Sequence, residues 1–124
     1  MDCPAVEEAR LHALINDLRN LLDETPWAEF KTSLNDPDRI GRLISAISNG
    51  ARLHDKTQGY LMWGIDDATH AVIGTEFDQN KKHKGQPFEF WMAGQIAPSL
   101  HMVYHTTIMN GHKITLLVSD RKLR

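Results

Sequence analysis

The sequence has only one cysteine, Cys3, and no apolar run near the roughly 20 residues that a membrane-spanning helix needs. A single cysteine forms no internal disulfide, and it lacks the second thiolate of a zinc motif. The first residues, MDCPAVEEAR, are acidic and polar, unlike the basic start and apolar middle of a secretory signal. We therefore expect a cytoplasmic protein with no membrane contact, folded around a hydrophobic core.

Several catalytic motifs are also missing. Without a GxxxxGK[ST] phosphate loop, direct ATP hydrolysis lacks its usual apparatus. There is no Gly-x-Ser-x-Gly elbow, and nothing in the sequence surrounds Cys3 with a catalytic triad. The seven histidines show no ligand spacing. His101 and His105 share one face of a predicted strand, but about 13 Å separates them, which is too far for one ion.

The size and charge of the chain suit one globular domain. It has 124 residues, of which 41% are apolar and 24% charged. The net charge of −2 hides an asymmetry, because residues 1–38 hold 9 acids and 3 bases, whereas residues 39–124 hold 7 acids and 11 bases. The second part can therefore present a basic face although the whole chain is not basic.

Apolar spacing predicts three helices. A helical stripe indicates the first over residues 6–23. The second is expected over residues 37–49, with Pro37 in its first turn and Gly50 at its end. A short third helix is expected from Phe88 to about Ile96. The polar segments that follow the second helix and precede the third are expected to be loops.

Strand patterns fill the intervals between the helices. The predicted strands are WAEFKTSL (27–34), GYLMWGI (59–65), AVIGTEF (71–77), LHMVYHTTIM (100–109) and HKITLLVSD (112–120). The second and third are expected to pair as a hairpin, and Asn110 and Gly111 are the favoured turn between the last two. The order α-β-α-β-β-α-β-β predicts an α+β fold, with a mixed, mostly antiparallel sheet and about three helices packed on it.

Acidic residues gather where predicted elements end. Glu24 and Glu29 follow the first helix, and Asp66 and Asp67 follow an apolar strand, where a sheet meets solvent. If the strands of Glu29 and Asp66 are neighbours, these carboxylates can converge on magnesium or manganese, and such a metal activates water against a phosphodiester. The alternative is that they are solvated or capping residues, with Asp67 only shaping a turn.

Basic residues are candidate contacts to phosphate. They are Lys31, Arg39, Arg42, Arg52, Lys56, Lys81, Lys82 and Lys84. Arg39 and Arg42 lie three apart on the second predicted helix, so with the bases near its end they can form one positive face. The lysines of KKHK are further candidates, although such a run on a loop is more often simply solvated.

Four motifs in order, E-x4-EFK, RIGRLISAISNG, GYLMWGIDD and AVIG, resemble the Schlafen AlbA-like domain from about Leu22 to Val118. That family includes parts of divergent-AAA proteins, bacterial transcriptional regulators and RecG-like or helicase-related proteins, and these parts are regarded as DNA-binding. The resemblance implies that residues 1–124 are a single such domain, the N-terminal part of a longer protein. It implies nucleic acid as the partner, DNA before RNA, and a homodimer.

The same resemblance leaves two other functions open. In animal Schlafen proteins, acids matching Glu24, Glu29 and the strand-end aspartate, Asp66 or Asp67, form a metal-dependent ribonuclease site. A magnesium- or manganese-dependent nuclease is therefore one alternative. The other is a non-catalytic protein-interaction domain, in which Phe30 is core and Glu29 pairs with a nearby base. The sequence departs from the family in the segment GARLHDKTQ, which replaces a tight link between helix and strand.

Overall fold

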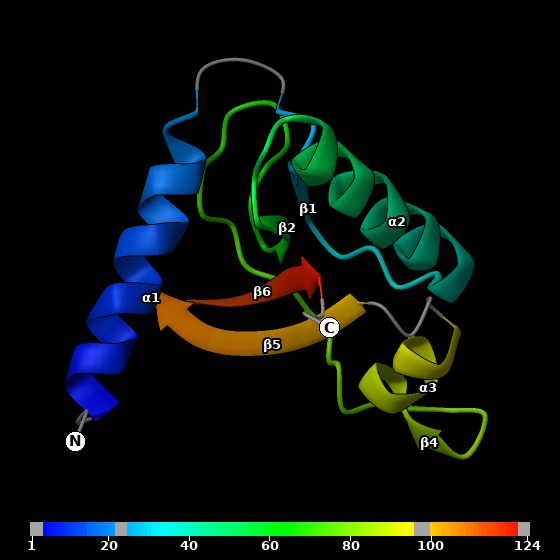
Figure 1. Cartoon of the computed structure of the whole chain (residues 1–124). Helices are drawn as coiled ribbons and strands as arrows, with labels where there is room; N and C mark the ends of the chain where they lie inside the picture. The colour runs from blue at the N-terminus through cyan, green and yellow to red at the C-terminus, as the bar shows by residue number, and fades with distance from the viewer. Residues whose placement is uncertain (1–3, 22–24, 96–99, 122–124) are drawn as a thin grey trace.

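A four-stranded sheet in the order β1-β2-β6-β5 lies between two layers of helix in the computed structural model (Figure 1), which describes residues 4–21, 25–95 and 100–121. The elements are α1 (Pro4–Arg19), β1 (Ala28–Lys31), α2 (Pro37–Leu53), β2 (Gln58–Trp63), β3 (Lys82–His83), β4 (Gln86–Pro87), α3 (Phe88–Gln95), β5 (Leu100–Met109) and β6 (His112–Arg121). This arrangement confirms the predicted α+β class and the mixed sheet.

The register explains which side chains each face presents. β1 is parallel to β2, and the pairs β2-β6 and β6-β5 are antiparallel. The turn between β5 and β6 is the predicted one, because Asn110 and Gly111 both have positive φ, 54° and 79°, as a type I′ turn requires. Since side chains alternate along a strand, the sheet presents one set of residues to α1 and the other to α2 and α3.

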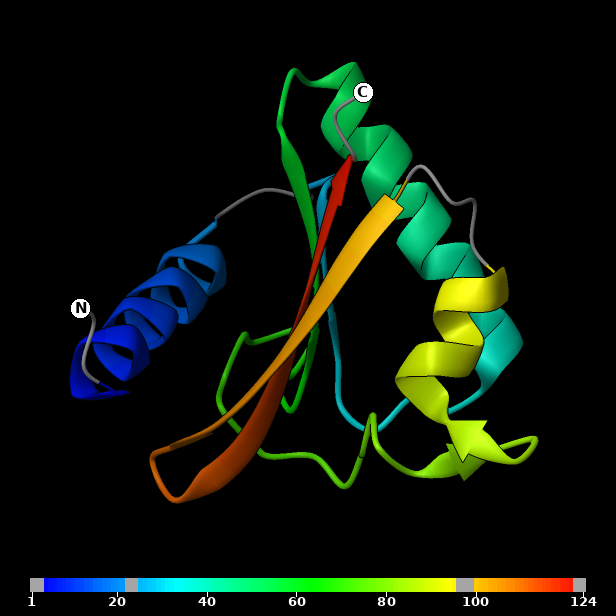
Figure 2. The ribbon, with the colours of Figure 1, turned by 60° about the horizontal axis from the view of Figure 1, so that its bottom comes forward.

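Each face of the sheet has its own core, and Figure 2 shows α1 on one side with α2 and α3 on the other. On the α1 side, Ile15 and Leu18 of the helix are buried together with Phe30, Met62 and Leu116. The opposite core consists of Ile40, Ile44, Ile47, Leu61, Trp63, Phe77, Phe88, Met92 and Leu117. Both faces are therefore covered, which agrees with the fully apolar run that predicted β2.

Helix α2 is longer than the sequence predicts. It starts as expected, with the Asp36 side chain accepting the Asp38 backbone N–H at 3.1 Å, but it continues to Leu53. The predicted stop at Gly50 is wrong because this glycine packs against Pro26 and the next residue, Ala51, is buried. The first residues of the expected loop after Gly50 are therefore helical.

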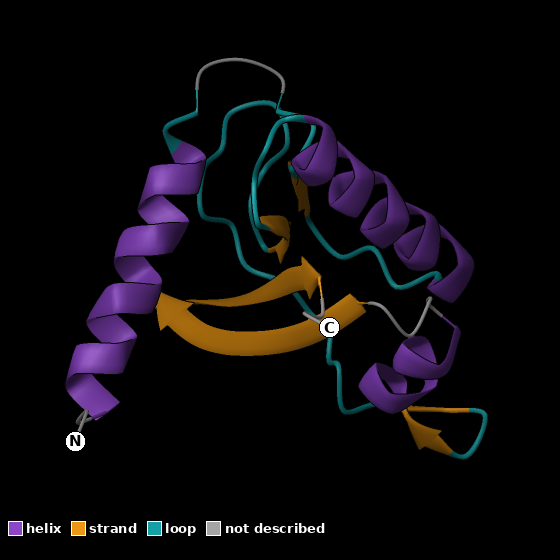
Figure 3. Cartoon of the chain, in the orientation of Figure 1, coloured by secondary structure: helices purple, strands orange, loops and turns teal. Residues whose placement is uncertain are grey.

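Two further expectations need correction. Residues 71–77 form no strand beside β2; Val72 makes a single antiparallel bridge with Ile65. The reason is that this segment, which Figure 3 draws as loop, changes partners. The Ile73 N–H donates to the Gly64 carbonyl, and the Thr75 N–H donates to the Lys113 carbonyl. In the polar connector that follows, β3 and β4 form a small hairpin where a loop was expected.

A glycine comparison tests the packing of α2. An added Cβ at Gly50 would lie 2.1 Å from the Pro26 carbonyl oxygen, whereas one at Gly94 in α3 meets nothing within 4 Å. Alanine is a better helix former than glycine, but overpacking outweighs that gain at Gly50. We therefore expect Gly50→Ala to lower the free energy of unfolding by about 1–3 kcal/mol. Gly94→Ala should raise it by about 0.5–1 kcal/mol.

Urea unfolding followed by circular dichroism measures both changes. A Gly50→Ala variant as stable as Gly94→Ala would show that α2 does not pack on Pro26 as described.

Candidate nucleic-acid interface

Three of the predicted phosphate contacts meet at one place. Ala28 and Phe30 of β1 point into the core beside α1, so Glu29 and Lys31 alternate toward the α2 side. Lys31 thereby joins Arg39 and Arg42 of α2 around a shallow hollow of about 300 Å³, whose other walls are Leu43 and Ala46. We call Lys31, Arg39 and Arg42 the basic cluster.

The two arginines are available because of where they lie on α2. The buried stripe of this helix contains Ile40, Ile44 and Ile47, and both arginines lie off that stripe and are exposed. Arg42 also borders a neighbouring hollow, which places it on the ridge between the two. Both guanidinium groups are therefore accessible from solvent, and neither is needed to fill the core.

Lys31 has a partner, the Glu29 carboxylate, with Nζ and Oε1 3.2 Å apart. The side chains of Lys31 and Glu29 are 25% and 33% exposed, so water screens the pair and it contributes little to stability. The hollow keeps a net positive charge, and one acid lies at its margin. A phosphate group can replace Glu29 as the partner of Lys31 at small cost.

The other five predicted basic contacts lie elsewhere. Arg52 is 13 residues beyond Arg39 on α2, a separation of about 20 Å along the helix axis. Lys56 lies near that same end, with its Nζ 4.9 Å from the centre of the Trp27 ring. The three lysines of KKHK belong to the β3-β4 hairpin and the residue before it: Lys81, Lys82 and Lys84. The eight residues therefore form three groups instead of one continuous face.

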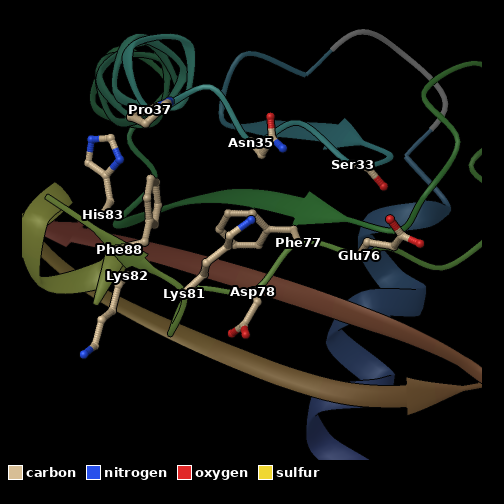
Figure 4. A pocket seen from close by; sticks show the side chains of 10 residues that line it. All are labelled: Ser33, Asn35, Pro37, Glu76, Phe77, Asp78, Lys81, Lys82, His83 and Phe88. Carbon is tan, nitrogen blue, oxygen red and sulfur yellow. The ribbon is translucent and has the colours of Figure 1, made fainter. Parts of the chain in front are cut away.

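A second hollow, of about 320 Å³, borders the segments that follow β1 and precede α3 (Figure 4), and we call it the hairpin hollow. It is lined by Ser33, Asn35, Pro37, Glu76, Phe77, Asp78, Lys81, Lys82, His83 and Phe88. The Lys82 amine points away from the rings of Phe77 and Phe88. Acids and bases are mixed here, so its attraction for phosphate is weaker than that of the basic cluster.

The predicted carboxylates do not form a complete site among the described residues. Register places Glu29 opposite Leu61, five residues before Asp66. No group of three histidine, cysteine, aspartate or glutamate side chains in the described part of the chain is arranged to hold a metal. Glu24 lies outside the described residues, so the metal-site hypothesis stays a prediction.

Asp66 has a structural role in the turn after β2. Its Oδ1 accepts the Ala68 backbone N–H at 2.9 Å, and its backbone carbonyl accepts the His70 N–H at 2.8 Å. The pKa of Asp66 lies below its usual value, chiefly because the Ala68 N–H stabilises the carboxylate, with Thr69 and His70 adding to the effect. Asp67, in contrast, is exposed in the turn.

The sequence pattern missed one residue of this surface. Trp91 lies within the third predicted helix at a core-like spacing from Phe88, yet its side chain is partly exposed and borders a hollow next to Arg42. A tryptophan at the boundary between core and solvent has the same helical spacing as a core residue, so periodicity does not separate the two.

The fold and this surface define an α+β domain with a basic hollow at the edge of its sheet. The family model of Schlafen AlbA_2 matches residues 24–123, most of the chain, and the chain belongs to this family. The resemblance found in the sequence is thereby confirmed. α1 lies before the matched span. A search of curated proteins found no match. No helix in the described parts of the chain has the length and apolarity to cross a membrane.

The turn after β2 gives a prediction for Asp66. Its folded pKa is lowered, so its contribution to stability is present above the unfolded pKa and is lost as the pH falls through the folded pKa. Asp66→Ala should therefore lower the melting temperature at neutral pH, and the difference from the unmodified protein should shrink in acid. Asp66→Asn keeps an oxygen acceptor for the Ala68 N–H, so it should lower the melting temperature less than Asp66→Ala does.

Asp67→Ala is the control for this measurement by thermal unfolding. Equal effects of the two alanine variants at neutral pH would contradict the turn-forming role of Asp66.

Proposed function

We propose that this domain binds nucleic acid, DNA before RNA, through the sugar-phosphate backbone. The observation that carries the proposal is the basic cluster, in which basic side chains from a strand and a helix surround one hollow. Family membership supports a role related to nucleic acid. Such a domain suits a cytoplasmic transcriptional regulator or helicase-related protein, where it would hold the nucleic acid.

The chemistry of the cluster suits phosphate. An arginine guanidinium can donate two parallel hydrogen bonds to phosphate oxygens, and two arginines beside a lysine can surround one phosphate group. Contacts of this type release counterions, so affinity falls steeply as salt rises and depends little on base sequence. The chain as a whole is slightly acidic, which confines the attraction to this local surface.

Charge reversal tests the cluster. We expect Arg39→Glu/Arg42→Glu to weaken binding of labelled DNA at least about 10-fold and to reduce the slope of log affinity against log salt by about 2, because two phosphate contacts are lost. Fluorescence anisotropy over a salt series measures both quantities.

The matched control carries the same change of charge at the other end of α2, in Arg52→Glu/Lys56→Glu. Its loss of affinity should be smaller. If the two double variants bind equally well, the basic cluster is not the phosphate site.

A second candidate function is metal-dependent cleavage of the bound strand, and the position of Glu29 favours it. This carboxylate pairs with Lys31 at the margin of the basic cluster, so a phosphate held there lies close to an acid. Glu29, with Glu24 and Asp66, would be the residues to hold magnesium or manganese, which supplies an activated water molecule when bound. Asp67 is the further carboxylate of this hypothesis.

Glu29→Gln separates the two functions. For a nuclease, this variant should lose manganese-dependent cleavage and keep or improve binding, since a negative charge next to the phosphate is removed. Gel analysis of labelled strands with and without chelator measures cleavage, and Asp17→Asn on α1 is the control. Absence of manganese-dependent cleavage by the unmodified domain would leave binding as its function.

A further inference from the structure

A third hollow, of about 380 Å³, lies between α2 and α3, and we call it the interhelix hollow. Trp91 and Met92 form its α3 side. On the α2 side, Gly41 and Ser45 are small and leave space in front of the tryptophan. Trp91 thus borders open space, whereas Met92 beside it is buried in the core.

The three hollows follow one another around the first half of α2. The interhelix hollow shares Arg42 with the basic cluster and shares Pro37 with the hairpin hollow. A ligand that crosses them would therefore meet a cationic site, an aromatic side chain, and then Lys81 and Lys82. A positively charged groove that also carries aromatic rings is typical of sites for single-stranded nucleic acid.

The ring of Trp91 is held in place by its neighbours. His83 of the β3-β4 hairpin contacts it edge-on, with ring centres 4.3 Å apart and planes at 74°, and the Phe88 ring centre lies at 6.4 Å. A ring fixed in this way loses little side-chain entropy when a base stacks on it. The hollow is therefore shaped before any ligand arrives.

Asp38 also borders the interhelix hollow, and its carboxylate determines where the phosphates and the nucleobases of a bound strand are favoured. It repels phosphate, and it accepts hydrogen bonds from the N–H groups on base edges. Phosphates are consequently favoured at Arg42, and a base is favoured beside Trp91.

From this arrangement we infer that the domain selects single-stranded nucleic acid, with an unpaired base stacked on Trp91 and the adjacent phosphate on Arg42. The inference rests on the proposed function and adds to it the class of strand. A duplex keeps its bases stacked inside and offers mainly phosphates to this surface, so it cannot fill the interhelix hollow.

The test compares short labelled single strands of DNA and of RNA with a duplex of the same DNA sequence, by fluorescence anisotropy at low salt. The unmodified domain should bind at least one type of single strand about 10-fold more tightly than the duplex. Trp91→Ala should weaken single-strand binding by about 10-fold and leave duplex binding unchanged, because one stacked base is lost. Trp91→Phe should keep most of the affinity.

Two further variants protect the test from effects on folding. Phe90→Ala changes the neighbouring residue of α3, which is 63% exposed and does not border the hollow, and it should bind normally. Ser45→Gln fills the hollow from α2 without altering Trp91 or any charge. It should weaken single-strand binding, and it decides the question if Trp91→Ala fails to fold.

The outcomes distinguish the two levels of the proposal. Equal binding of single strand and duplex, with no effect of Ser45→Gln and a large effect of Arg39→Glu/Arg42→Glu, would overturn the strand preference and keep the proposed function. Absence of salt-sensitive binding to any strand would overturn both.

Discussion

The packing of Trp63, at the end of β2, is the interaction on which the surface formed by α2, α3 and the β3-β4 hairpin depends. Its side chain is fully buried, and its indole N–H donates to the Leu34 carbonyl at 2.8 Å. Its ring stacks on Phe77, with centres 4.0 Å apart and planes at 3°. One side chain thereby fixes the loop that leads into α2 and the segment that leads to the β3-β4 hairpin. Those two segments form walls of the hairpin hollow.

The opposite face of the sheet is covered by α1. α1 is held by its buried Ile15 and Leu18 and by polar contacts at its middle and its C-terminal end. His12 Nε2 lies 2.8 Å from the Thr107 hydroxyl oxygen, and the Arg19 Nε–H donates to the His70 carbonyl at 2.7 Å. α1 precedes the span matched by the family and packs on one face of the sheet. The basic cluster lies on the other.

The sequence predicted the class of the fold and the three helices, because their apolar spacing and the Asn110-Gly111 turn are local signals. It placed the end of α2 wrongly, because Gly50 is a helix terminator by local rules and a close-packing residue in the fold. It predicted a strand at residues 71–77 from composition, but hydrogen bonds to two different partners prevent a continuous ladder there. The candidate basic residues were identified in the sequence by residue type. Only the positions of these residues on α2 and β1 showed which of them lie together.

By itself the sequence determined the amphipathic helices, the buried strands, the tight hairpin and the motifs of the family, since each depends on residues close together in the chain. Only the tertiary structure brought Lys31 beside Arg39 and Arg42, and Trp91 beside Arg42. It also gave Asp66 a turn to stabilise, a role its place after an apolar strand does not reveal. The physical reason is that a binding surface is made of neighbours in space, and packing of the two cores sets which side chains become neighbours.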